Sequence, residues 1–132
     1  MRSGIESSVA HVDVTVTAEM VARLDDRVVH PVYSTFWLCY HAEVAARRAI
    51  EPYFEGDENA CGTGLSITHK AMAAVGAHVR VTASVLSIVG NRITCSIEAR
   101  IHGSDHLLAE GRQEQAILST TRLADLAASA LR

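Results

Sequence analysis

A carboxylate, a hydroxyl and an imidazole occur in this chain at spacings that could support acid/base or nucleophilic chemistry. Glu43 lies within residues 36–46, a segment that is apolar on nearly every side if it forms a helix and that should therefore be buried. A buried carboxylate is costly unless it is neutral, hydrogen-bonded or paired. Thr35 opens the same segment, and His69 ends a later strand-like run. These three side chains are the candidate catalytic residues.

Each of the three also has a purely structural explanation. Glu43 could be a structural helix residue, either exposed at a gap or paired with Arg47 one helical turn later. Thr35 could serve only as the N-cap of the helix, and His69 could be a hydrogen-bonded core residue. Eight helical residues, about 12 Å along the axis, separate Thr35 from Glu43, so the two can flank a substrate but cannot touch each other.

The hydrophobic pattern predicts the elements that must position these residues. Residues 12–16 alternate apolar and polar side chains, which indicates a first strand. Two prolines bracket the apolar segment. We therefore expect one helix of about four to five turns that begins at Ser34 or Thr35 and ends near Ile50 or Glu51.

The second half of the chain predicts an antiparallel sheet. Four segments alternate apolar and polar residues: 62–70, 79–85, 93–101 and about 105–119. Gly76 marks a break, Gly90 and Gly103 mark tight turns, and Thr121 would cap a short terminal helix. A helix that is apolar all round needs a strongly curved sheet to cover it. The predicted fold is therefore α+β, a hotdog fold with a curved antiparallel sheet wrapped around one long central helix, plus a short C-terminal helix.

Composition limits the possible partners. The 132 residues predict one domain, and the net charge of −3 with scattered basic residues argues against nucleic-acid binding. No apolar run approaches the roughly 20 residues that cross a bilayer, and the N-terminus has no apolar signal core. The basic residues that could meet an anionic ligand at the rim of a pocket are Lys70, Arg80, Arg92 and Arg100.

The cysteines and histidines do not form a metal-binding pattern. Cys39, Cys61 and Cys95 are far apart and odd in number, and the seven histidines are dispersed. We interpret the cysteines as free thiols in a reducing cytoplasm, and we expect neither a metal nor a cofactor.

Three stretches of the chain match a known pattern: residues 35–53, residues 62–71, and the strand pair 79–83 with 111–116. In these stretches the chain resembles the hotdog-fold acyl-CoA thioesterases, and most closely the fluoroacetyl-CoA thioesterase family. The resemblance implies hydrolysis of a small acyl-CoA or acyl-carrier thioester to a free acid and a thiol. It also implies Thr35, Glu43 and His69 as catalytic residues, and Gly62 as the glycine whose backbone N–H lies near the thioester.

The same resemblance suggests which residues meet the substrate. Phe36 could line the acyl pocket, and Gln115 stands where the family carries an arginine. The fluoroacetate-specific member has phenylalanines in a lid before the helix, whereas residues 23–34 form a shorter connection here and contain none. These departures weaken the expectation of fluoroacetyl selectivity and leave general thioester hydrolysis open.

A curved sheet around one helix leaves an edge open, and pairing two copies is the usual way to close it. We therefore expect a homodimer with a shared pocket, and the association of two such dimers stays open. Two other functions also stay open. One is a non-catalytic acyl-CoA-binding hotdog protein, and the other is a hotdog hydratase or dehydratase acting on an enoyl thioester.

Overall fold

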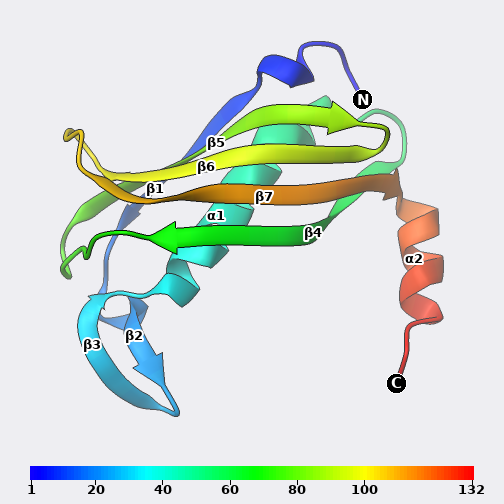
Figure 1. Cartoon of the computed structure of the whole chain (residues 1–132). Coiled ribbons are helices and arrows are strands. Elements are labelled where there is room, and N and C mark those ends of the chain that lie inside the picture. Colours follow the sequence, from blue (N-terminus) through cyan, green and yellow to red (C-terminus); the bar gives the residue numbers. More distant parts are fainter.

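A five-stranded antiparallel sheet curves across the long helix α1 (Thr35–Ile50) in the computed structural model, which describes residues 1–132 (Figure 1). The strand order is β1-β5-β6-β7-β4. The strands are β1 (Val9–Thr15), β4 (Glu58–His69), β5 (His78–Val89), β6 (Arg92–Ile101) and β7 (Leu107–Ser119). This arrangement confirms the predicted hotdog fold.

Helix α1 begins where its capping residue predicts. Ser34 is the N-cap, and its hydroxyl accepts a hydrogen bond from the Trp37 backbone N–H at 3.1 Å. Thr35 is the first helical residue, so its hydroxyl is free for another contact. The helix ends at Ile50, and the short 3₁₀ turn Glu51–Tyr53 contains Pro52.

The core lies between α1 and the sheet. The fully buried side of α1 is made largely of alanines, which let the helix approach the sheet closely: Ala42, Ala45, Ala46 and Ala49. The predicted alternation of β5 and β6 is confirmed, because the inward residues at these positions are buried: Val79, Val81, Ala83, Ile93, Cys95, Ile97 and Ala99. No helix combines the length and apolar character needed to cross a bilayer.

A β-bulge in β4 changes which of its residues face α1. Gly62 pairs with Gln115 of β7, and Gly64 pairs with Glu114, so Thr63 has no partner in the ladder. Further along, Leu65 is opposite Gln113. Gly62 and His69 are seven residues apart and would face opposite sides in a regular strand. The extra residue restores both to the side of the sheet that α1 covers.

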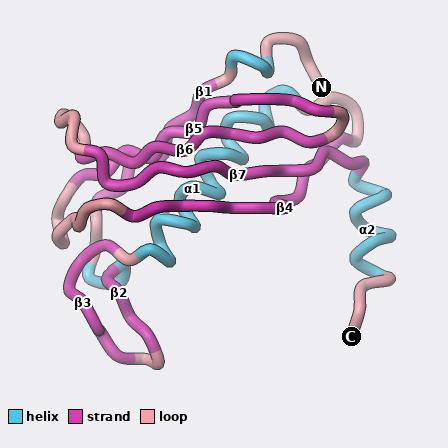
Figure 2. Tube along the Cα trace, in the orientation of Figure 1, coloured by secondary structure: helices cyan, strands magenta, loops and turns pink.

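The connection before α1 is a hairpin, which the sequence pattern did not predict. Strands β2 (Val21–Leu24) and β3 (Arg27–Tyr33) pair antiparallel and extend past the sheet near the start of α1 (Figure 2). Asp25 and Asp26 join them with φ angles of 50° and 60°. Tight hairpin turns need such positive φ values and favour Asp, Asn and Gly.

Three boundaries near the C-terminus differ from the prediction. Strand β7 begins at Leu107, and residues 102–106 connect it to β6, so Gly103 lies in a longer loop than a tight turn. Helix α2 (Thr120–Ala128) is capped by Ser119, not by Thr121, because the Ser119 hydroxyl accepts the Arg122 N–H at 3.0 Å. Helix α2 packs at the opposite end of the sheet from the hairpin (Figure 2).

Candidate functional site

Thr35 and His69 form a direct hydrogen bond. Thr35 Oγ1 lies 2.9 Å from His69 Nδ1, which joins the first residue of α1 to the last residue of β4. Burial lowers the pKa of His69, although the nearby Ala71 backbone opposes this shift. The ring is therefore neutral at pH 7, and its buried Nε2 atom has no hydrogen-bond partner.

A pocket of about 270 Å³ opens over this pair. The β2–β3 hairpin, the start of α1 and the segment after β4 line it, and Thr35 and His69 are both part of its wall. A larger concavity of about 470 Å³ lies on the outer face of the sheet, where Glu98, Glu110 and Arg112 contribute to its lining. That concavity contains none of the predicted site residues, so the smaller pocket is the relevant one.

Glu43 is half-buried and bonded to a residue that the sequence pattern did not indicate. Gln113 Nε2 lies 3.3 Å from Glu43 Oε1 and 3.2 Å from Oε2. The amide therefore donates to the carboxylate as a neutral partner. The charge of Glu43 also contributes, after burial, to raising the pKa of the Cys39 thiol one turn earlier in α1.

The Glu43 carboxylate packs directly against the backbone of Gly62. A Cβ atom built on Gly62 would lie 2.9 Å from Glu43 Oε2 and 3.5 Å from Gln113 Nε2. Real Cβ atoms essentially never approach another atom this closely, so a side chain at position 62 would force the carboxylate to shift. Gly62 is therefore the residue whose missing side chain makes room for the acid.

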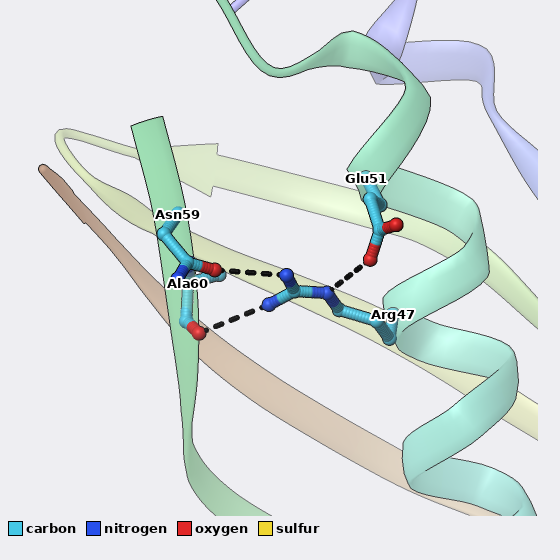
Figure 3. A network of polar contacts seen from close by, with 4 residues as sticks. All are labelled: Arg47, Glu51, Asn59 and Ala60. Carbon is cyan, nitrogen blue, oxygen red and sulfur yellow. Dashed lines mark hydrogen bonds and ion pairs between the residues drawn. The ribbon is translucent and has the colours of Figure 1, made fainter. Parts of the chain in front are cut away.

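Arg47 does not pair with Glu43, so the ion pair considered for the acid does not form. Its guanidinium instead bonds Glu51 at 2.5 Å, Asn59 Oδ1 at 2.8 Å and the Ala60 carbonyl at 3.1 Å (Figure 3). Asn59 and Ala60 belong to β4, just before Gly62. The network fixes the second half of α1 against the part of β4 that contacts Glu43.

Within one chain, the predicted residues form two separate groups. Thr35 and His69 make one, and Glu43, Gly62 and Gln113 make the other. No hydrogen bond connects them. The groups are about 12 Å apart along α1, and roughly 20 Å apart along β4. The pocket lined by Thr35 and His69 does not include Glu43, so the two groups do not share that cavity within one chain.

The remaining predicted residues divide between surface and interior. The Phe36 side chain is 76% exposed and packs only edge-on to Trp37. Gln115 is buried, opposite Gly62 in the ladder, and its Nε2 atom has no partner. Phe36 is therefore largely open to solvent within one chain, whereas Gln115 lies in the core opposite Gly62, the glycine that contacts the acid.

The basic residues considered for an anionic ligand are all paired with carboxylates. The pairs are Lys70 with Glu110 at 2.7 Å, Arg80 with Asp13 at 2.8 Å, Arg92 with Glu114 at 2.6 Å, and Arg100 with Glu98 at 3.4 Å. Exposed pairs of this kind contribute only about 0–1 kcal/mol. They therefore do not prevent a phosphate from recruiting the same side chains.

Sequence patterns missed two buried polar partners. Gln113 occupies an inward position of β7, opposite Cys95 and Leu65 of the neighbouring strands, so a polar residue at an inward position of an alternating strand was the available signal. Tyr33 Oη lies 2.6 Å from His41 Nδ1, and both side chains are buried. Burial lowers the pKa of His41 and raises that of Tyr33. The tyrosine hydroxyl therefore donates to a neutral ring.

Comparison with known proteins gives consistent matches. The family model described as fluoroacetyl-CoA-specific thioesterase matches residues 16–121. A fluoroacetyl-CoA thioesterase from Streptantibioticus cattleyicolor is 32% identical over 87 residues, which is 66% of this chain and 61% of that protein. The match therefore spans less than two thirds of that relative.

Solved structures agree in fold over most of their length. A hypothetical protein of Thermus thermophilus, described as a thioesterase superfamily member, is 36% identical with a TM-score of 0.91, covering 97% of this chain and 93% of that one. A variant of a fluoroacetyl-CoA-specific thioesterase, solved with fluoroacetate and CoA, is 25% identical with a TM-score of 0.78, covering 89% and 97%.

Proposed function

Because this chain belongs to the fluoroacetyl-CoA-specific thioesterase family, a family of thioester hydrolases, we propose that it hydrolyses a small acyl-CoA or acyl-carrier thioester. Glu43 is the acid on which this function depends. The observation that supports it most is that Gly62 and Gln113 enclose a single carboxylate that has no cationic partner. The free thiols of Cys39, Cys61 and Cys95 support a reducing, cytoplasmic location.

In the proposed reaction, Glu43 removes a proton from water, and the oxygen attacks the thioester carbon. The tetrahedral intermediate then expels the thiolate, leaving a free acid. Alternatively, Glu43 attacks directly, and water hydrolyses the resulting mixed anhydride. Backbone N–H groups near Gly62 are suitable for the oxyanion, because the bulge leaves Thr63 outside the ladder.

Thr35 and His69 hold the other side of the substrate in this proposal. The bond to Thr35 fixes the ring through Nδ1, so Nε2 is the ring nitrogen left to contact the thioester. Gln115, opposite Gly62 in the ladder, supplies a further donor through its unpartnered Nε2. Because single chains keep the acid far from the Thr35–His69 pair, we propose that two copies build each site together.

The open edge of β4 supports this dimer. Strand β4 is the last strand of the sheet, is 12 residues long, and is exposed from Gly62 to Ser66. Such an edge is a template for another strand. Two β4 strands that pair antiparallel about a two-fold axis would close both edges at once.

The same pairing would unite the two groups. If the axis passes through Ser66 and Thr63 again stays outside the ladder, then Gly62 lies opposite the partner's His69. Paired strands are only about 4.8 Å apart, compared with roughly 20 Å along one strand. Since the bulge turns Gly62 and His69 toward the same face of the sheet, Glu43 would then face the Thr35–His69 pair of the other copy.

Release of free thiol from a panel of acyl-CoAs tests the activity. We expect Glu43→Gln to reduce turnover at least about a hundredfold, the scale of a lost acid/base group. Normal turnover by this variant would remove Glu43 from the mechanism. Tight binding without thiol release by the unmodified protein would indicate a binding protein. Loss of enoyl absorbance without thiol release would indicate a hydratase.

Mixing two inactive variants tests the shared site. In a dimer of one Glu43→Gln chain and one His69→Ala chain, a shared arrangement leaves one site fully intact. After subunit exchange of an equal mixture, about a quarter of the wild-type activity should return. If each site belonged to a single chain, no site would be intact and no activity would return.

A further inference from the structure

Gln113 is a polar side chain placed in the most buried layer of the sheet. It lies on β7, opposite Leu65 of β4 and Cys95 of β6, and is 1% exposed. Cys95, its neighbour on β6, carries a buried thiol. The inward positions of β5 and β6 are otherwise apolar. An amide in such a place is unfavourable unless its hydrogen bonds are made.

Only half of the Gln113 amide has a partner, and that partner is Glu43. Nε2 bonds both carboxylate oxygens at 3.3 and 3.2 Å, while Oε1 is buried and unpartnered. The opposite orientation would place Oε1 against the carboxylate, two acceptors facing each other, so the acid fixes the direction of the amide. An apolar side chain of the same size would leave no unpaired oxygen. The amide at this position therefore acts toward the acid and does not serve packing.

Three surfaces together hold the carboxylate. Gln113 bonds it from β7, Gly62 contacts it from β4, and α1 carries it. Along the same face of α1, Cys39 lies one turn before Glu43, and Arg47 lies one turn after it and bonds Glu51 and Asn59. Gln113 is the one residue that donates a side-chain hydrogen bond to Glu43.

We propose that Gln113 is a positioning residue that aims the Glu43 carboxylate at the substrate. This inference depends on the proposed function, because it assigns Gln113 a role only through Glu43. A neutral donor suits the task. It restrains both oxygens without supplying a charge that would compete for the proton or the thioester carbonyl.

Gln113→Met tests the proposal, since methionine has a similar length and no N–H donor. We expect kcat to fall about ten- to hundredfold, the effect of losing a hydrogen bond to a charged group, with KM changed less than about twofold. The melting temperature should stay the same or rise, because the unpaired amide oxygen is removed. The control is Cys95→Ala, which disturbs packing directly across from Gln113 without touching Glu43, and it should keep kcat. Wild-type kcat in Gln113→Met would overturn the proposal.

Gln113→Glu tests whether the side chain at position 113 meets the acid that limits the rate. A second carboxylate against Glu43 raises the apparent pKa of the pair, so the acidic limb of kcat/KM should move to higher pH by about one unit or more. An unchanged pH profile in this variant would also overturn the proposal. Failure of the proposed function is separable, because it would appear as full activity in Glu43→Gln. Failure of this inference alone would leave Glu43→Gln inactive and Gln113→Met active.

Discussion

Gly62→Ala is the smallest change that should move the proposed catalytic acid without unfolding the protein. Gly62 lies in a strand and has none of the positive φ angles found at other glycines, so alanine can adopt its backbone conformation. The added Cβ would lie 2.9 Å from Glu43 Oε2, whereas ordinary contacts begin at 3.4 Å. The carboxylate is the end of a flexible side chain, so it should retreat by about 0.5 Å while the strand stays in place.

This displacement predicts a loss of activity with little loss of stability. The Gln113 hydrogen bonds to Glu43 are already 3.2 and 3.3 Å long, so a further 0.5 Å would break at least one of them. A misplacement of 1 Å can cost about a hundredfold in rate, so half that distance should cost about tenfold. Alanine also restricts the unfolded chain, which offsets part of the lost bond. The melting temperature should therefore shift by no more than about 4 °C.

The assay compares thiol release and thermal unfolding in two matched variants. In Gly64→Ala, two residues further along the same strand, the new Cβ would meet only Glu114 Cβ at 3.8 Å, an ordinary contact. This control should keep wild-type kcat. Equal kcat in Gly62→Ala and Gly64→Ala would refute the reasoning, because it would mean that the position of the carboxylate does not limit the rate.

Neighbouring residues around α1 allow three further predictions. Ser34→Ala should lower the free energy of unfolding by about 1 kcal/mol through loss of the N-cap. Thr35→Val removes a solvent-exposed hydrogen bond, so it should cost no more than about 1 kcal/mol while reducing thiol release at least about tenfold. Tyr33→Phe should cost about 1–3 kcal/mol in a denaturant titration, because it leaves buried His41 Nδ1 unpaired. Burial lowers the folded-state pKa of His41 and His69 below 6.5, so the unfolded chain binds more protons below that pH. The melting temperature should therefore fall as the pH drops from about 6.5 to 5, and a flat profile would contradict this.

The local pattern was sufficient for the fold. The alternation in β5 and β6 and the bracketed apolar helix predicted a sheet wrapped around α1, because inward positions of strands and helices recur at fixed periods. The β2–β3 hairpin was missed because its turn uses two aspartates, not glycine, and because its strands are short and largely exposed. Capping was ambiguous by one residue at α1, since Ser34 and Thr35 are both good caps, and the predicted cap of α2, Thr121, was wrong by two residues.

The candidate site was only partly predictable. Residue types and spacing indicated Thr35, Glu43 and His69, because polar groups in apolar segments need an explanation that the segment itself does not supply. They did not indicate Gln113, whose partner lies 70 residues away in the chain. They also did not reveal that His69 bonds Thr35 and not the acid.

The sequence by itself determined which elements form and which of their residues point inward, since both depend on neighbours a few positions away. Only the tertiary structure decided where the acid rests. The bulge at Thr63 sets the register between β4 and β7, and that register turns Gly62 toward Glu43 and places Gln113 within reach of it. Register is a long-range property, because one inserted residue reverses the face of every residue beyond it.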